Sequence, residues 1–64
     1  MIEDRISDEV RVITVPDGDT GRWTTTIVGG PMDGYQMTCR DDDAGAQHAA
    51  AIEQARTADA ARSA

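Results

Sequence analysis

The stretch from Arg22 to Val28, which reads Arg-Trp-Thr-Thr-Thr-Ile-Val, decides the fold. Its β-branched residues are typical of a strand, and successive side chains on a strand point to opposite faces of the sheet. One face therefore carries Trp23, Thr25 and Ile27, while the intervening residues face the other way. Threonine suits a pleated surface that is partly exposed, so this pattern predicts a half-buried strand.

Two further strands are predicted on either side of this stretch. Glu9–Val15 is rich in β-branched residues and stops at a proline, which is a strand signal. Between the two strands lies Pro16–Gly21, whose Pro, Asp and Gly residues are typical of a hairpin turn. A second glycine-rich turn, Gly29–Gly34, leads to the third predicted strand, Tyr35–Arg40.

A long alanine-rich run predicts a helix over residues 43–61. Alanine has the highest helix propensity, and aspartate is favoured at the N-cap and near the positive end of the helix dipole. The fold class is therefore α+β: an antiparallel three-stranded sheet over residues 9–40, with one C-terminal helix across a face (βββα). Residues 1–8 are mostly charged, and we expect a disordered terminus or one short turn there.

The length and composition limit how stable the fold of this chain can be. Residues 1–64 fit one small domain, and so short a chain buries a limited share of its surface. It has no Leu or Phe, which predicts a thin core. Cys39 is its only cysteine and His48 its only histidine, so neither an internal disulfide nor a structural zinc site is expected. We therefore expect stabilisation by burial against another chain.

The net charge of −6 comes from twelve acidic residues and six arginines. Such a charge argues against direct binding to nucleic-acid phosphates and against binding to anionic membranes. It favours a protein partner with a basic surface, because complementary charge speeds encounter and fixes register. The alternative is that the charge only keeps a small protein soluble.

Two patterns point to chemistry, and each has a simpler interpretation. Asp17 and Asp19 resemble the start of a calcium loop, but the twelfth position, which should be Glu, is Val28. Cys39 with His48 as its base would suit nucleophilic catalysis. Neighbouring aspartates would raise the pKa of that thiol, so a buried, inert thiol is the favoured interpretation. We therefore expect no catalytic residue, no metal ligand and no cofactor.

The residues expected to contact a partner are charged or aromatic. One aspartate suffices to cap the helix, so the other two in the run before it have no structural explanation. Tryptophan is enriched in interface hot spots, although in a small domain it is equally a core residue. The predicted partner-binding residues are Asp41, Asp42, Asp43, Asp17, Asp19, Trp23 and Arg22.

The stretch from Gly21-Arg22-Trp23 to Ala55 resembles the N-terminal domain of HicB-type antitoxins. These domains run Gly-x-Trp, a strand, a Gly-centred turn, a third strand, an acidic helix start and an Ala-rich helix. The final strand and DNA-binding segment of that family do not follow here, which argues against a repressor role. The resemblance implies an antitoxin-like module that blocks a toxin by strand or helix docking.

The stretch from Val10 to Ile52 is similar to the dimerisation domain of actinobacterial xenogeneic-silencer proteins. The likeness lies in an early Val-rich strand, an acidic Gly loop, a strand bearing Asp33, Gly34 and Tyr35, and a capped helix. This resemblance implies a stand-alone decoy that pairs with the oligomerisation surface of a host silencer. Independently of this resemblance, a homodimer is an open alternative.

The phrase Val-Gly-Gly-Pro-Met-Asp-Gly at residues 28–34 is similar to one found in small actinophage proteins, and the absence of Lys, Asn and Phe fits a high-GC genome. The expected function is a small, acidic, non-enzymatic and phage-encoded modulator that binds and inhibits a host DNA-associated protein. Candidates are a nucleoid silencer, a topoisomerase or a defence nuclease. A homodimeric structural or accessory virion protein is the further alternative. Without a signal peptide or membrane span, we expect a cytoplasmic protein, in the host cytoplasm if it is phage-encoded.

Overall fold

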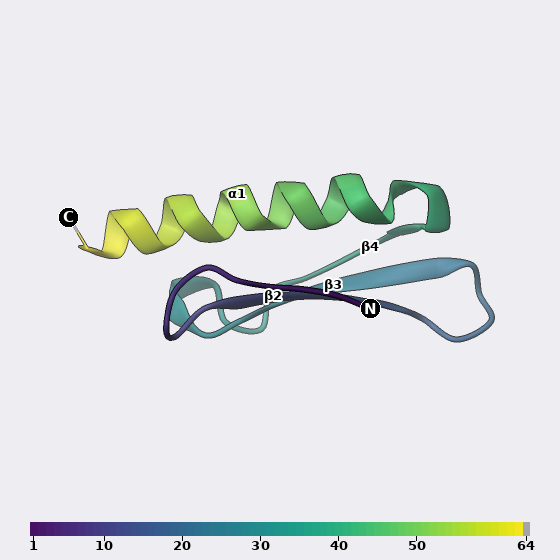
Figure 1. Ribbon diagram of the computed structural model, residues 1–64, viewed down its shortest axis with the longest axis horizontal. Coiled ribbons are helices and arrows are strands. Elements are labelled where there is room, and N and C mark those ends of the chain that lie inside the picture. Colours follow the sequence, from purple (N-terminus) through teal and green to yellow (C-terminus); the bar gives the residue numbers. More distant parts are fainter. Residues whose placement is uncertain (64) are drawn as a thin grey trace.

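The computed structural model describes residues 1–63, with side chains through Ala61, and Ala64 lies outside it. The four strands form one antiparallel sheet in sequence order, and α1 lies along one of its faces, so the molecule has two layers (Figure 1). The α+β class with one C-terminal helix is confirmed. The elements are β1 (Ile2–Arg5), β2 (Arg11–Pro16), β3 (Arg22–Val28), the 3-10 turn η1 (Gly30–Met32), β4 (Gln36–Arg40), the 3-10 turn η2 (Asp41–Asp43) and α1 (Ala44–Ser63).

The prediction of three strands was wrong, because the N-terminal segment forms a fourth strand, β1. This strand pairs antiparallel with β2, with Ile2 opposite Thr14. The spacing of Ile2 and Ile6 is compatible with a helical turn and equally with alternate positions on a strand. Asp4 lies between them on the face of the sheet that α1 covers, and its charge interrupts the apolar alternation that would have indicated a strand. An edge strand therefore takes the place of the disordered terminus or turn expected for residues 1–8.

The remaining elements lie close to their predicted positions. β3 has the predicted bounds, β4 begins one residue later than expected, and α1 runs from Ala44 to Ser63 instead of 43–61. β2 begins at Arg11 because the preceding carbonyl, that of Val10, belongs to the turn after β1. That carbonyl accepts hydrogen bonds from the backbone N–H of Ile6 at 2.8 Å and of Ser7 at 3.3 Å.

A thin apolar core lies between the sheet and α1. Ala51 and Ala55 are buried in it, which lets the helix approach the sheet closely. Within the described residues only three large aliphatic side chains are buried: Val10, Val12 and Ile27. Since hydrophobic stabilisation scales with buried apolar area, a core of this size leaves the fold sensitive to the polar contacts around it.

The turn between β3 and η1 requires glycine. Gly29 has a φ of 84°, and a Cβ placed there would overlap the carbonyl oxygen of Glu9. A Cβ on Gly30 would lie 2.6 Å from Cγ2 of Val10. Asp33 fixes the other side of this turn, because its Oδ1 accepts a 2.7 Å hydrogen bond from the N–H of Gly29. The turn after β3 is thereby packed directly against the turn that joins β1 to β2.

Candidate functional site

Five of the predicted partner-binding residues come together at one end of the molecule. The β2–β3 hairpin loop carries two of these aspartates and η2 carries three. A 2.9 Å hydrogen bond from the backbone N–H of Asp41 to the carbonyl of Gly21 joins the two segments. They lie at the right-hand end of the ribbon in Figure 1. We call this set the acidic end: Asp17, Asp19, Asp41, Asp42 and Asp43.

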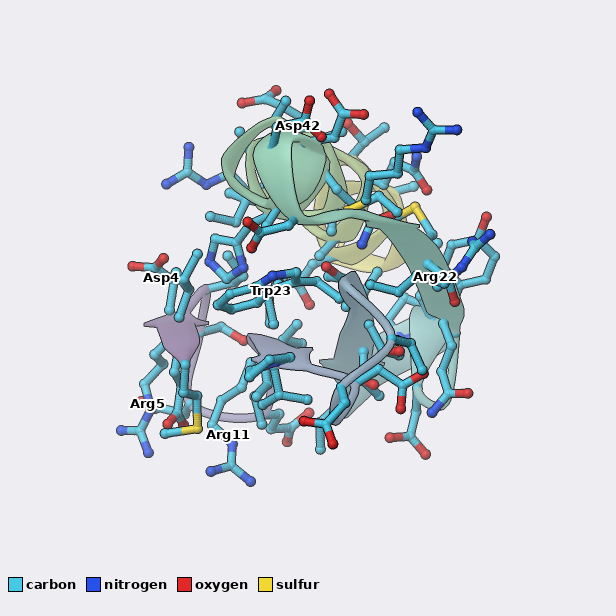
Figure 2. The ribbon with its side chains drawn as sticks, turned by 90° about the vertical axis from the view of Figure 1, so that its right-hand side faces the viewer. Asp4, Arg5, Arg11, Arg22, Trp23 and Asp42 are labelled. Atoms are coloured by element: carbon cyan, nitrogen blue, oxygen red, sulfur yellow. The ribbon has the colours of Figure 1, made fainter. Side chains whose placement is uncertain are left out.

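Trp23 stabilises the acidic end through a hydrogen bond. Its indole Nε1 donates a 2.6 Å hydrogen bond to Oδ1 of Asp41. The side chain is half-buried, pairs across the sheet with Cys39, and lies between the sheet and α1 (Figure 2). This hydrogen bond fixes the first aspartate of η2 to β3, so Trp23 orders the site from within instead of projecting freely towards a partner.

The other four carboxylates of the acidic end are available. In the part of the chain that the structure describes, the side chains of Asp17, Asp19, Asp42 and Asp43 are exposed and make no hydrogen bond or ion pair. The hairpin loop is nevertheless ordered by its backbone. The Thr20 hydroxyl donates to the carbonyl of Asp17 at 2.8 Å, and the N–H of Asp17 donates to the carbonyl of the first residue of β3 at 2.8 Å.

Arg22 lies beside the acidic end but on the opposite side of the sheet. It pairs in register with Arg40, and both side chains are exposed. Because Trp23 and Cys39 point towards α1, their neighbours Arg22 and Arg40 point away from it. The structure therefore separates Arg22 from the aspartates with which the sequence grouped it.

Cys39 and His48 do not form a nucleophile and base. Partial burial, followed by the carboxylates of Asp43, Asp42 and Asp41, raises the pKa of the Cys39 thiol. A raised pKa keeps the thiol protonated and makes it a poor nucleophile near neutral pH. Both ring nitrogens of His48 are engaged by other residues.

A chain of hydrogen bonds crosses the interface between the sheet and α1, and no motif in the sequence predicts it. Oδ2 of Asp4 lies 2.7 Å from Nε2 of His48, whose Nδ1 lies 2.7 Å from Oγ1 of Thr14. Oγ1 of Thr14 lies 2.7 Å from Oγ1 of Thr25. The side-chain amide of Gln47 donates to Oγ1 of Thr25 at 2.9 Å. We call these five residues the polar chain.

The inventory of donors and acceptors fixes the direction of the polar chain at its two ends, where His48 meets a carboxylate and Gln47 donates its amide. A carboxylate only accepts, so His48 donates from Nε2 to Asp4. For a neutral imidazole, Nδ1 accepts from the Thr14 hydroxyl, which accepts from Thr25, which accepts from Gln47. Every buried side-chain nitrogen and oxygen within the described residues has a partner. The hydrogen-bonding groups of the polar chain that are buried are therefore all satisfied, in a core with few large apolar side chains.

Asp4, His48 and Thr14 share the connectivity of an acid–base–nucleophile triad, but not its accessibility. Thr14 and Thr25 are both 0% exposed, and His48 is 5% exposed. A substrate carbonyl has no route to a hydroxyl that is enclosed in this way. What the arrangement does is fasten β1 and α1 to the middle of the sheet.

A shallow apolar groove lies away from the acidic end. It has a volume of about 360 Å³ and is lined by Met32 of η1 and, on α1, by Glu53, Gln54, Thr57 and Ala58. None of the predicted site residues lines it. Within residues 1–63, no group of three or more His, Cys, Asp or Glu side chains is placed to hold a metal ion, and no helix has the length and apolarity to cross a membrane.

Comparison of the chain with protein families, with curated proteins and with solved structures finds no match. The resemblances to HicB-type antitoxins and to silencer dimerisation domains accordingly stay predictions.

Proposed function

We propose that this chain is a non-enzymatic protein-binding module that docks its acidic end on a basic surface of its partner. The observation that carries the proposal is the joining of the hairpin loop to η2. Hydrogen bonds from Asp41 to Gly21 and from Trp23 to Asp41 hold the two segments together. A site ordered before binding loses less conformational freedom when the partner arrives.

Charge supports the same proposal. Four carboxylates of the acidic end have no partner within the described chain, so they are free to meet cations without first breaking an ion pair. An exposed group of like charges steers encounter with a surface of opposite charge and makes the association rate fall as salt rises. Binding should therefore be strongest at low ionic strength.

The partner class that we propose is a host protein that works on DNA. A surface built to bind phosphates presents cations in clusters, and a cluster of carboxylates can occupy the same cations. The chain would then act as a DNA mimic and inhibit its partner by competition. A nucleoid silencer, a topoisomerase and a defence nuclease are the candidates, and the setting is a cytoplasm, that of the host if the protein is phage-encoded.

The test is a competition assay with fluorescence anisotropy. Labelled duplex DNA is bound to a purified silencer, topoisomerase or nuclease, and the chain is titrated in at several salt concentrations. We expect displacement of the DNA, weaker at higher salt. The variant Asp42→Asn/Asp43→Asn should need at least about tenfold more protein for the same displacement, which corresponds to about 1.4 kcal/mol.

The matched control removes two carboxylates elsewhere, in the variant Asp8→Asn/Glu53→Gln. It changes the net charge by the same amount and should leave displacement within about twofold of the unchanged chain. Equal weakening by the two variants would show that only net charge matters. Absence of displacement with all three partner classes would also overturn the proposal.

A further inference from the structure

The four arginines of the strands all lie on one face of the sheet. The buried side chains of Thr14 and Thr25 mark the inner face, which α1 covers. Alternation along each strand then sends the arginines to the opposite side, which we call the outer face. In Figure 2, Arg5 and Arg11 extend away from α1, whereas Asp4 lies on the helix side. These outer-face arginines are Arg5, Arg11, Arg22 and Arg40.

The arginines stand in two pairs at the two ends of the outer face. Arg5 lies opposite Arg11 on β1 and β2, and Arg22 lies opposite Arg40 on β3 and β4. Arg11 also lies opposite Val28, which is six positions beyond Arg22 on β3. At about 3.3 Å per residue, the two pairs are about 20 Å apart along the strands.

Aliphatic and threonine side chains fill the space between the pairs. Ile13 lies opposite Thr26, and Val15 lies opposite Thr24. Ile13 and Val28 are half-buried, and Val15 is 36% exposed. The outer face thus carries a few aliphatic side chains among threonines and Gln36, with a cationic pair at each end.

The charge of the outer face is opposite to that of the whole chain. Within the described strands, its only acidic side chain is Glu3, and Oε2 of Glu3 lies 3.4 Å from Nη1 of Arg11. A second copy stacked face to face would bring two sets of arginines together, and juxtaposed like charges are costly. A single-stranded nucleic acid would need aromatic side chains for its bases to stack on, and the outer face has none among the described strand residues, since Trp23 points inward.

We propose that the outer face binds an acidic amphipathic helix of another protein. The aliphatic side of that helix covers Ile13, Val15 and Val28, and its carboxylates pair with the arginines at each end. The two pairs also lie two strands apart, about 10 Å across the sheet, so the docked helix runs obliquely and spans about 22 Å. A helix rises 1.5 Å per residue, so the two groups of carboxylates are expected about 15 residues apart. The docked helix would cover the open face of the sheet, as helices do in three-layer domains. This surface is separate from the acidic end and takes a partner of opposite charge.

The test uses the full chain, labelled with ¹⁵N, and a defined probe. The probe is a capped synthetic helix of about 20 residues, with leucines along one stripe and two glutamates at each end of it, about 15 residues apart. We expect saturable shifts of the amide resonances of Ile13, Thr24 and Thr26, which weaken as salt is added. Replacing the four arginines by glutamine should lower the affinity at least tenfold, whereas Arg56→Gln on α1 should leave it unchanged.

Several outcomes would overturn the proposal. Equal binding of a probe with lysines in place of its glutamates would show that charge plays no part in binding. An oligothymidine that shifts the same resonances more strongly would make this a nucleic-acid surface, and concentration-dependent shifts without probe would make it a self-association surface. Absence of any shift of the amide resonances would show that the outer face does not bind such a helix. The variant Asp42→Asn/Asp43→Asn should still bind the probe, which separates this test from that of the acidic end.

Discussion

Nε2 of His48 lies 2.7 Å from Oδ2 of Asp4, and this contact joins the first strand to the helix. The two partners differ in environment, since the side chain of His48 is 6% exposed and that of Asp4 is 53% exposed. Water therefore screens the carboxylate, so the contribution of this pair is modest on its own. The larger effect on the free energy of unfolding comes from the hydrogen bond between Nδ1 of His48 and the buried Thr14 hydroxyl.

Replacing His48 with alanine should destabilise the fold by about 2–4 kcal/mol, because it removes the hydrogen bond between the imidazole and the buried Thr14 hydroxyl and opens a cavity. Urea denaturation followed by circular dichroism measures this change. The control is Gln54→Ala on the exposed side of α1, which should shift the unfolding free energy by about 0.5 kcal/mol or less. Similar losses in the two variants would show that the polar chain has no special role.

The two threonines should behave as a coupled pair. Thr14→Val or Thr25→Val alone should cost about 1–3 kcal/mol, because each leaves a buried polar neighbour unsatisfied. The double variant should cost less than the sum, since both single changes remove the same 2.7 Å hydrogen bond. A double-mutant cycle of unfolding free energies gives the coupling. Strict additivity would contradict the connected chain that we describe.

Gly29 and Gly18 offer a matched pair of backbone tests. Both have positive φ, but a Cβ at Gly18 would meet nothing within 4 Å, whereas one at Gly29 would overlap the carbonyl oxygen of Glu9. Gly18→Ala should cost about 1–2 kcal/mol from backbone conformation alone. Gly29→Ala should cost more than about 3 kcal/mol or prevent folding. Equal melting temperatures for the two variants would refute the close packing of the two turns.

The Cys39 thiol should react slowly with iodoacetamide near neutral pH. Partial burial and the carboxylates of Asp43 and Asp42 raise its pKa, so the thiolate fraction at a given pH is smaller than in the urea-unfolded chain. Asp42→Asn/Asp43→Asn removes two of these causes and should speed alkylation at fixed pH. A rate profile over pH for both folded proteins and the unfolded chain measures this. No change of rate in the double variant would count against the effect of the carboxylates.

The same shift fixes the sign of a pH effect on stability. The folded chain holds the Cys39 proton to a higher pH than the unfolded chain does. This group therefore leaves stability unchanged below the ordinary thiol pKa and lowers it as the pH rises above that value. A Cys39→Ala variant should lack this alkaline decline, and denaturation curves at rising pH make the comparison.

Local patterns were sufficient for most of the fold. The alternation in Arg22–Val28 placed β3, the glycine-rich turns placed its neighbours, and the alanine run placed α1. These signals are carried by residues close together in the chain. β1 was missed because its inward side chain, Asp4, is charged. A carboxylate on the inward side of a strand is stabilised here by the hydrogen bond with His48, which lies 44 positions later in the sequence.

The candidate site was predictable by residue type but not by arrangement. The aspartates were identified from the sequence. Their proximity in space depends on the strand order, which places the hairpin loop beside η2. Alternation along β3 places Arg22 on the face opposite Trp23, but the sequence does not show that Trp23 contacts Asp41 and so does not show which face the aspartates border. His48 does follow the spacing of the buried helix positions Ala44, Ala51 and Ala55, which indicates burial, but its partners on the sheet could not be inferred from it.

The contact between Asp4 and His48 spans 44 positions of the sequence. Neighbouring strands of this sheet associate over short stretches of chain, but β1 completes its interactions only after α1 has been synthesised and has packed. The earliest and latest elements thus depend on each other, and neither end should unravel by itself. Loss of structure in this small molecule should accordingly occur in one cooperative transition, seen at the same denaturant concentration by probes of the strands and of the helix.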